Sequence, residues 1–497
     1  MITALLGACL LAAIPAGLRW LRVAQREHYL AGSVATFAGR WWTSGPLNDV
    51  LLALMVGGLV GSWWSAWWAF LVPAAQLGPI GLSIRGRTSP LAWTARMRRA
   101  AIVAGILMLG VYSAGAALES GFFIALGLFL LPALIDIALL VLGPIERMLG
   151  NRWVEQASAR LQSSGAKVVA ITGSYGKTTT KQYAAHLLAG TFRTVASPAS
   201  FNNRMGLARA INEHLVPGTE VFVAEMGTYG PGEIEALTRW IPPDVAAMVA
   251  IGPVHLERFR TLERIVAAKS EILDRARVGV ISVDHPLLAG LASERKTTMD
   301  VITVSGDGAD ARVTVAEGVI RVDGLKLGEI SHDVFAVNLA VAVGIGLALG
   351  MEPGDMASRM EGIPRPEHRQ TLSSSERGFA VIDDTFNSNP AGARMALDLL
   401  ERVGDGGRKV VVTPGMVELG PDQFEQNLVF AAESAAVADD LLVVGRTNRD
   451  ALLEGSAKGG ASVTVVTSRE EAVDWVRRNL GPGDAVLYEN DLPDHYP

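Results

Sequence analysis

The chain has 497 residues, 49% of them hydrophobic, so it is longer than one ordinary domain and more apolar than a typical soluble protein. Its net charge of −6, without a basic segment in the soluble part, argues against nucleic-acid binding. The single cysteine, Cys9, excludes disulfides within the chain and a thiolate metal cluster.

The first 150 residues hold most of the long apolar runs. Four stretches approach the roughly 20 apolar residues that a membrane-spanning helix needs, namely Thr3–Leu18, Val50–Ala74, Ala101–Leu118 and Phe122–Leu142. The first has no basic segment before it, which favours a retained helix over a cleaved signal peptide. Four tryptophans, at positions 63, 64, 67 and 68, stand toward one end of the second stretch, where an aromatic belt belongs. These features predict a transmembrane helical region over residues 1–150.

Arginines indicate which loops face the cytoplasm. One group marks the loop before the third stretch as cytoplasmic: Arg85, Arg87, Arg96, Arg98 and Arg99. A second group precedes Val50–Ala74: Arg19, Arg22, Arg26 and Arg40. Both groups cannot be cytoplasmic if Val50–Ala74 crosses the membrane once. Either that stretch is re-entrant or the first loop breaks the rule.

Asp136 lies inside the fourth apolar run. A carboxylate at membrane depth is a candidate for function, in contact with a lipid-linked substrate or an arginine. The alternative is a structural partner close to the membrane interface. The sequence leaves both interpretations open.

A phosphate-binding loop is predicted after residue 172. Val168–Thr172 is a β-branched run and Lys177–Gly190 has the length of a helix. The loop residues are Gly173, Ser174, Tyr175, Gly176, Lys177, Thr178 and Thr179. Backbone N–H groups at the helix start would hold phosphate oxygens, Lys177 would neutralise their charge, and the Thr178 hydroxyl would bind Mg²⁺. Because Ile171 stands where the full motif has glycine, a chance glycine turn is the alternative.

Two later strands end in possible metal ligands. Glu220–Ala224 leads to Glu225, and Asp244–Ile251 leads to His255. Ligands bind at the carboxyl ends of parallel strands, so Thr178, Glu225 and His255 are expected to converge on one Mg²⁺. Taken singly, Glu225 is also compatible with a helix start and His255 with a loop.

Lys269 interrupts an apolar stripe in the helix expected at Thr261–Arg275. It follows Ile265 by four positions and Val266 by three, so it shares their face. A lysine that extends its amine to the surface is the ordinary explanation. A buried, functional lysine is the other.

A second α/β domain begins near Gly378. Five strands are predicted there: Phe379–Asp383, Lys409–Thr413, Asp440–Val444, Ser462–Thr467 and Asp484–Tyr488. Ser468 and Glu471 form a capping-box pattern at the start of one intervening helix. The alternation of strands and helices indicates a Rossmann-like domain. Residues 487–497 are acidic and aromatic, and no role is predicted for them.

With these motifs the sequence resembles the Mur ligase family, which joins an amine to a carboxylate in peptidoglycan precursors. The matching stretches are ITGSYGKTTTK (171–181), FNNRMGLA (201–208), AEMGTYGPGEIEAL (224–237), IGPVHLERF (251–259), AAKSEIL (267–273), IDDTFNSNP (382–390) and GMVELG (415–420). Within the family, the branch that adds D-alanyl-D-alanine is the most similar.

The resemblance implies roles for matching residues, with ATP and Mg²⁺ as cofactors. Catalysis is assigned to Lys177, Lys269, His255 and Arg369, and Lys269 would be carbamylated to help position metal. Metal binding is assigned to Thr178, Glu225, His255 and Lys269. ATP contacts are assigned to the loop 173–179, to Asn338 at the adenine, to Arg369 at the γ-phosphate and to Asp384 at the ribose. Substrate contacts are assigned to Asn202, Asn203, Asn387 and Asn389. Alternatives are a helix cap for Asn338 and surface charges for Arg369 and Asp384.

The implied architecture is an N-terminal α-helical transmembrane region at 1–150 followed by α/β domains. A P-loop parallel-sheet ATPase domain would cover 151–370, and a Rossmann-like domain would cover 371–497. The implied activity is ATP-dependent amide-bond ligation through an acyl phosphate at the cytoplasmic face of the plasma membrane, in wall-precursor synthesis. The expected partners are the lipid bilayer, a carboxylate substrate such as a wall precursor, and an amino acid or dipeptide amine.

The sequence departs from the family in three places. Membrane stretches replace the domain that holds the UDP-sugar, Pro414-Gly415 replaces the usual Gly-Asp, and Asp333 rather than asparagine follows His332. These departures concern the substrate more than the ATP chemistry. The rival interpretations are a membrane poly-γ-glutamate synthase and a non-catalytic nucleotide-binding scaffold for wall enzymes.

Overall fold

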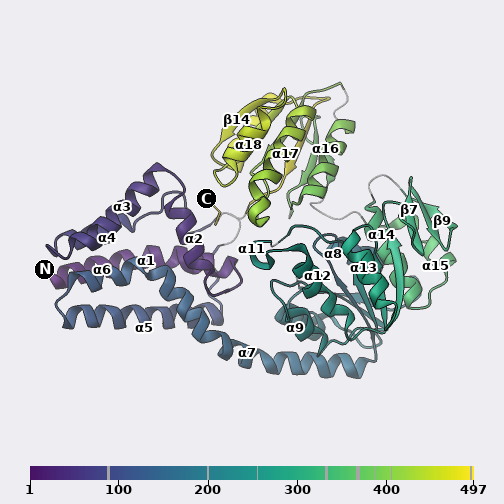
Figure 1. The fold of residues 1–497 in the computed structure, drawn as a ribbon, viewed down its shortest axis with the longest axis horizontal. Coiled ribbons are helices and arrows are strands. Elements are labelled where there is room, and N and C mark those ends of the chain that lie inside the picture. The colour runs from purple at the N-terminus through teal and green to yellow at the C-terminus, as the bar shows by residue number, and fades with distance from the viewer. Residues whose placement is uncertain are drawn as a thin grey trace.

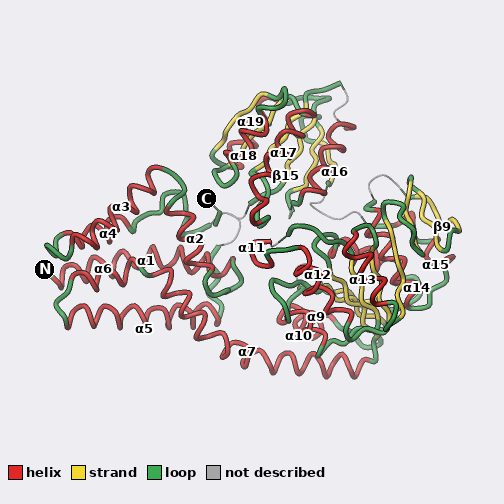
Figure 2. Tube along the Cα trace, viewed as in Figure 1, coloured by secondary structure: helices red, strands yellow, loops and turns green. Residues whose placement is uncertain are grey.

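The computed structural model describes residues 1–86, 90–198, 201–254, 256–330, 334–364, 370–386, 388–403, 406–492 and 495–496. Three parts follow one another along the chain (Figure 1). The first is built from helices and loops, and the strands belong to the second and third parts (Figure 2). The α/β expectation for the last two-thirds of the chain is therefore confirmed.

The helical part packs around its own apolar core. Its helices are α1 (Ile2–Arg26), α2 (Ser33–Trp42), α3 (Pro46–Gly61), η1 (Trp68–Phe70), α4 (Leu71–Ala75), α5 (Ala95–Ala117), α6 (Gly121–Phe129) and the first half of α7 (Leu131–Ser164). Within the described residues, α1 and α5 are long and apolar enough to cross a membrane. The bent pairs α2–α3 and α6–α7 raise the number of candidate spans to four if each pair counts as one.

The second apolar stretch folds back on itself instead of forming one straight helix. Gly58 and Gly61 on α3 face Trp68, where a Cβ at Gly61 would lie 2.6 Å from the indole. The segment after α4 then returns to the start of α3, where the backbone N–H of Ile80 donates to Asn48 Oδ1 at 2.7 Å. Arg19, near the end of α1, donates to the carbonyl of Gly78 at 2.8 Å. Residues 78–80 therefore contact both α1 and the start of α3, and the second apolar stretch begins and ends at the same end of the helical part.

Asp136 has a structural partner. Its carboxylate accepts hydrogen bonds from the backbone N–H groups of Val34 at 3.2 Å and Ala35 at 2.8 Å. These are N–H groups of the first turn of α2, which have no partner within the helix. Asp136 therefore caps α2 from α7, and this explains a carboxylate in an apolar run without a catalytic role.

Helix α7 connects the helical part to the central part (Figure 1). Leu131–Leu142 contributes to the core of the helical part, whereas Val154, Ala157 and Leu161 pack in the core of the central part. The helix runs without a break across residue 150, where the apolar composition of the sequence ends. One helix is thus shared by two hydrophobic cores.

The central part contains a nine-stranded sheet in the order β2-β3-β1-β4-β5-β6-β7-β8-β9. The strands are β1 (Lys167–Thr172), β2 (Thr194–Ala196), β3 (Val221–Glu225), β4 (Val245–Met248), β5 (Val278–Ser282), β6 (Asp300–Ser305), β7 (Val313–Ala316), β8 (Val319–Val322) and β9 (Leu325–Glu329). All neighbours are parallel up to β7, and β8 and β9 are antiparallel. Parallel strands buried on both faces need helices on both sides.

Those helices form two layers. On one face lie α8 (Lys177–Leu188) and α14 (Ala336–Ala348), with α15 (Pro353–Ala357) nearby. On the other lie α9 (Arg204–His214), α10 (Glu233–Thr238), α11 (Leu256–Phe259), α12 (Leu262–Ser270), η2 (Glu271–Leu273), α13 (Pro286–Arg295) and the second half of α7. The phosphate loop expected from the sequence lies between β1 and α8.

The C-terminal part has a six-stranded sheet in the order β10-β11-β15-β12-β13-β14. Its strands are β10 (Thr371–Ser374), β11 (Ala380–Asp384), β12 (Lys409–Thr413), β13 (Asp440–Val444), β14 (Ser462–Val466) and β15 (Ala485–Glu489). Its helices are α16 (Pro390–Val403), α17 (Gln423–Val437), α18 (Arg449–Ser456) and α19 (Arg469–Asn479), with η4 (Gly420–Asp422) before α17. The five predicted strands are confirmed, and Ser468 caps α19 by accepting from the Glu471 N–H at 3.2 Å.

The C-terminal tail docks on the helical part. His495 is buried, its carbonyl accepts from Trp41 Nε1 at 2.8 Å, and its ring packs on Phe37 with centroids 4.8 Å apart. His495 Nε2 lies 2.9 Å from Glu27 Oε1, and the other oxygen of Glu27 accepts from Arg258 of α11 at 3.2 Å. Glu27 therefore joins the tail, the helical part and the central part at one point.

Candidate functional site

The phosphate loop has the backbone geometry that its sequence requires. β1 is buried from Val168 onward, and the loop turns into α8 at Gly176, whose φ is +76°. Only glycine adopts this left-handed conformation without a steric cost. Lys177 Nζ folds over the loop and donates to the carbonyls of Gly173 at 2.8 Å and Ser174 at 3.3 Å. The lysine thus stands above a helix N-terminus, the arrangement that binds phosphate.

Two neighbours hold the loop in place. Asn338, on the first turn of α14, donates from Nδ2 to the carbonyl of Gly176 at 2.8 Å. A Cβ at position 176 would lie 2.6 Å from that same nitrogen, so glycine is required for space as well as for φ. On the other side, the Tyr175 ring covers Gly252, where a Cβ would lie 2.3 Å from the ring. Asn338 therefore contacts the loop directly and does more than begin a helix.

Glu225, the last residue of β3, is the centre of the polar cluster beside the loop. Its Oε2 accepts from Thr178 Oγ1 at 2.9 Å and from Lys181 Nζ at 3.1 Å, and its Oε1 accepts from Asn202 Nδ2 at 3.1 Å. Burial alone would raise the pKa of this carboxyl, but the charges of Lys181 and Lys177, together with the hydrogen bonds from Asn202 and Lys181, hold the pKa below its usual value. Glu225 is therefore an anion within contact of the loop.

Lys181 is a further residue of this cluster that was not predicted from the sequence. It stands one helical turn after Lys177 on α8, and both it and Glu225 are almost completely buried. Buried ammonium groups are rarely found without a partner. The available signal was its four-residue spacing from Lys177, which puts both lysines on one face of α8. Its ion pair fixes the Glu225 carboxylate against the start of the helix.

Lys269 is buried on α12, as its position in the apolar stripe suggested. Only 3% of its surface is exposed, so the snorkelling alternative is excluded. Burial, and then the nearby positive charge of Lys177, hold the pKa of the Lys269 amine well below its ordinary value. A neutral amine is the nucleophilic form of lysine.

The donors present suit a magnesium ion. Mg²⁺ usually binds one or two carboxylates together with water and substrate phosphates, and a hydroxyl beside a carboxylate meets that need. Thr178 and Glu225 provide this pair at 2.9 Å. Among the described residues, no group of three or more His, Cys, Asp or Glu side chains could hold a metal ion without such further ligands. His255, the third expected ligand, lies outside the described residues.

The remaining predicted residues divide into two groups. Asn202 and Asn203 stand at the edge of the cluster, where Asn203 Oδ1 caps α9 by accepting from the Gly206 N–H at 3.0 Å. Ser174 donates to the carbonyl of Gly252 at 3.1 Å, and Thr179 is buried on α8.

The second group belongs to the C-terminal part. Asp384 ends β11, and Asn389 Oδ1 accepts from the Gly392 N–H at 3.0 Å to cap α16. Both side chains are buried. Arg369 and Asn387 lie outside the described residues. The two domains meet where the Leu256 N–H, at the start of α11, donates to the carbonyl of Glu418 at 3.1 Å.

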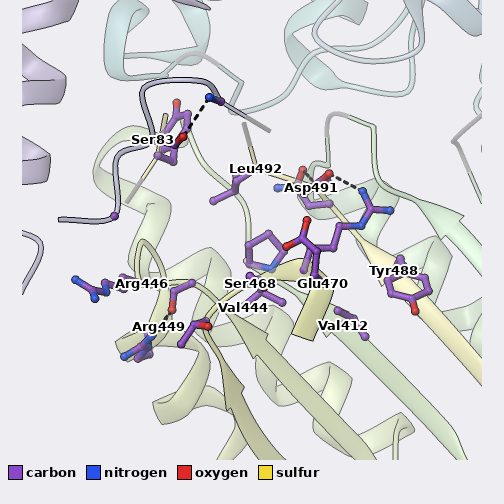
Figure 3. A pocket seen from close by; sticks show the side chains of 18 of the residues that line it. Ser83, Val412, Val444, Arg446, Arg449, Ser468, Glu470, Tyr488, Asp491 and Leu492 are labelled. Carbon is purple, nitrogen blue, oxygen red and sulfur yellow. Dashed lines mark hydrogen bonds and ion pairs between the residues drawn. The ribbon is translucent and has the colours of Figure 1, made fainter. Parts of the chain in front are cut away.

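A separate cavity of about 630 Å³ lies at the carboxyl ends of β12 to β15 (Figure 3). Its wall from the helical part includes Trp41, Gly81 and Ser83. Arg469 and Asp491 also line the cavity and form an ion pair at 2.5 Å. None of its lining residues belongs to the predicted site, so the cavity is distinct from the phosphate loop.

Comparison with known proteins gives two family matches. The profile described as the Mur ligase middle domain matches residues 171–341, and that described as the Mur ligase, glutamate ligase domain matches residues 368–488. The first begins within β1 and includes the phosphate loop, Glu225, Lys269 and Asn338. The second covers nearly the whole C-terminal sheet.

Individual relatives carry one recurring name. The UDP-N-acetylmuramoyl-tripeptide–D-alanyl-D-alanine ligase of Bacillus subtilis is 28% identical over 67% of this chain and 75% of its own length. The ligase of the same name from Mycobacterium leprae is 29% identical over 66% of this chain and 72% of its own length.

Solved structures of that ligase share the fold. MurF from Acinetobacter baumannii superposes with a TM-score of 0.59 at 23% identity, over 68% of this chain and 77% of its own. MurF from Thermotoga maritima in complex with ADP superposes with a TM-score of 0.56 at 24% identity, over 69% of this chain and 80% of its own. The arrangement of a phosphate-loop domain and a second α/β domain is common to all three.

Proposed function

Since this chain belongs to the Mur ligase family and is an ATP-dependent carbon–nitrogen ligase, we propose that it forms an amide bond in peptidoglycan precursor synthesis, through an acyl phosphate, at the cytoplasmic face of the membrane. The observation that carries the proposal is the contact of Thr178 with the buried, ionised Glu225 beside the phosphate loop.

The proposed reaction proceeds in two steps. A carboxylate oxygen of the first substrate attacks the γ-phosphorus of ATP, and the bond to ADP breaks. The nitrogen of a neutral amine then attacks the acyl carbon, inorganic phosphate leaves with the carboxylate oxygen, and the amine loses a proton. Positioning and charge neutralisation supply most of the catalysis in phosphoryl transfer.

The chain's own residues serve the first step. Lys177 already lies over the loop carbonyls, from which its ammonium can turn to the β- and γ-phosphate oxygens. The first N–H groups of α8 provide further donors. Arg369 and His255 keep their proposed roles at the γ-phosphate and the metal. Asp384 is proposed at the ribose and Asn338 at the adenine.

Thr178 and Glu225 would hold Mg²⁺, which when bound neutralises charge on the phosphate oxygens. Lys181 contributes by fixing Glu225 in one orientation, since its ammonium lies 3.1 Å from the carboxylate. The Glu225 carboxylate stays ionised because of this lysine, so its oxygens remain available as ligands.

Lys269 is proposed to be carbamylated, in line with its matching motif. A lysine reacts with carbon dioxide only as the neutral amine, and burial on α12 favours that form. The reaction joins the Nζ nitrogen to the carbon of carbon dioxide and releases one proton. The resulting carbamate carries a negative charge, which would be balanced by Lys177 and the metal.

The membrane location is supported by the surface of the helical part. Trp63, Trp64, Trp67 and Trp68 are all more than half exposed around the turn between α3 and α4. Arg19 lies at the opposite end of the same hairpin, where it donates to the carbonyl of Gly78 at 2.8 Å. Aromatic residues at one boundary and arginines at the cytoplasmic boundary are typical of a membrane protein. The helical part therefore would hold the catalytic domains at the cytoplasmic face, near a substrate already in the bilayer.

D-Alanyl-D-alanine is the amine to test first, because it appears in the name of the Bacillus subtilis relative. The test uses the full chain in detergent with a wall-precursor carboxylate labelled with heavy oxygen. An acyl phosphate transfers one labelled oxygen to inorganic phosphate, which mass spectrometry detects. Phosphate without label, alongside amide formation, would exclude the acyl phosphate. Glutamate as the accepted amine would favour a poly-γ-glutamate synthase. Absence of an amide product with every amine tested would favour a non-catalytic scaffold.

A further inference from the structure

A buried carboxyl group that the proposed reaction does not use lies at the carboxyl edge of the C-terminal sheet. Glu489 ends β15 and is completely buried. Its strand lies between β11 and β12, so its side chain reaches the ends of both neighbours. Buried carboxyl groups without a structural or functional partner are rare.

Glu489 accepts hydrogen bonds from residues next to the loops that follow β11 and β12. Ser388, in the loop between β11 and α16, donates its hydroxyl to Glu489 Oε1. Thr413, the last residue of β12, donates its hydroxyl to Glu489 Oε2 at 2.5 Å. Thr413 Oγ1 in turn accepts from the Gly415 N–H at 2.9 Å. One carboxyl thus holds the end of the β11–α16 loop on one side and the end of β12, from which the next loop starts, on the other.

Each loop adjoins a residue that the proposed function uses or that contacts the central domain. The loop after β11 begins at Asp384, the residue proposed to contact the ATP ribose. The loop after β12 includes Glu418, whose carbonyl accepts from the N–H of Leu256 at 3.1 Å, next to position 255. A change at Glu489 would therefore displace the two segments by which the C-terminal domain meets the nucleotide and the central domain.

We propose that Glu489 is a positioning residue for ligation, which aligns the loop that starts at Asp384 with bound nucleotide by holding Ser388 and Thr413. The proposal rests on the proposed function, since it assumes that Asp384 contacts the nucleotide. Glu489 itself touches no reacting atom. Its effect is exerted through the loop.

The alignment depends on a proton. Asp384 and Glu489 are register partners on adjacent parallel strands, so their carboxyl groups lie on the same face. Burial raises the pKa of Glu489 to about 8, the Thr413 hydroxyl opposes this, and the charge of Asp384 adds to it. Asp384 is the charged group acting from β11, whereas Thr413 on β12 and Ser388 before α16 are neutral hydroxyls. Near neutral pH the uncharged acid is therefore favoured, in which one oxygen carries the proton and donates it to the hydroxyl that it faces, and above about pH 8 Glu489 becomes a second anion beside Asp384.

The test measures the affinity of the full chain in detergent for magnesium-bound ADP between about pH 7 and about pH 9. Wild-type affinity should weaken with rising pH by roughly threefold to tenfold, where tenfold corresponds to about 1.4 kcal/mol. Glu489→Gln imitates the uncharged acid and should remove that pH dependence while keeping the affinity at the lower pH. The matched control is Glu433→Gln, which removes an exposed carboxylate of the same domain from its pair with Arg394 and should keep the wild-type profile.

A second variant separates positioning from folding. Thr413→Val removes one of the two hydrogen bonds to Glu489 without changing the charge of the protein, and should weaken ADP binding severalfold at the lower pH. Equal pH profiles for wild type and Glu489→Gln, or unchanged affinity in Thr413→Val, would overturn the proposal. Wild-type protein that binds no magnesium-bound ADP at any pH would instead contradict the proposed function.

Discussion

Replacing Lys181 with methionine should destabilise the central domain and disturb the site at Glu225. The Lys181 Nζ and Glu225 Oε2 atoms are 3.1 Å apart, and neither side chain is more than 4% exposed. At an effective dielectric constant of about 20, this distance corresponds to an attraction of roughly 5 kcal/mol. Desolvation of both groups offsets part of this attraction. Removal of one partner of a buried pair costs roughly 3–5 kcal/mol, because the other charge stays buried. Methionine keeps an unbranched side chain and lacks little more than the ammonium group, so the loss is mainly electrostatic.

The assay is thermal unfolding of the full chain in detergent, followed by circular dichroism. For a domain of this size, a loss of roughly 3 kcal/mol lowers Tm by about 6 °C or more. The control is Arg239→Met, which breaks an exposed pair with Glu235 and should cost less than about 1 kcal/mol. The double variant Lys181→Met/Glu225→Gln should recover part of the loss, since no buried charge is left alone. A Tm of Lys181→Met equal to that of the control would show that the buried pair of Lys181 and Glu225 does not stabilise the domain.

Three further outcomes are expected. Gly176→Ala forces a left-handed residue at roughly 1–2 kcal/mol and displaces Asn338, so calorimetric titration should show about tenfold or greater loss of ADP affinity. Because folding lowers the pKa of Glu225, the ionised carboxylate stabilises the folded protein above about pH 4.5, and this contribution is lost as the pH falls through the pKa of the folded state. The free energy of unfolding of Glu225→Gln should therefore fall less steeply with decreasing pH than that of wild type. His495→Ala should remove the ring contacts of the tail with Phe37 and Glu27 and speed cleavage of the tail in limited proteolysis, whereas unchanged cleavage would contradict the docking.

The sequence predicted those parts of the site that depend on local patterns. The β-branched run before the glycine loop, and the lysine and threonine after it, specify a strand, a turn and a helix start within a short segment. The same holds for the five C-terminal strands and for the Ser468 cap. The contact between Thr178 and Glu225 was predicted because ligands bind at the carboxyl ends of parallel strands, and the 2.9 Å distance between their oxygens agrees with this prediction.

What the sequence could not predict depends on contacts between distant segments. Lys181 looks like an ordinary surface lysine until α8 is packed on β3 beside Glu225. Glu489 is recognisable as a buried group only once the order β11-β15-β12 is known. Asp136 was left open because its partners are backbone groups about a hundred positions earlier in the chain. The tail contact of His495 with Trp41 joins the two ends of the protein, and no local pattern encodes it.

Amine-dependent formation of an amide product tests the central claim most directly. The full chain in lipid nanodiscs would be supplied with ATP, Mg²⁺, a wall-precursor carboxylate and D-alanyl-D-alanine, and ADP and product masses would be measured together. Wild type should release one ADP per amide bond, and Lys177→Ala, whose helical part should insert normally, should form neither product. Amide formation by Lys177→Ala, or ADP release by wild type that no carboxylate and amine pair changes, would contradict it.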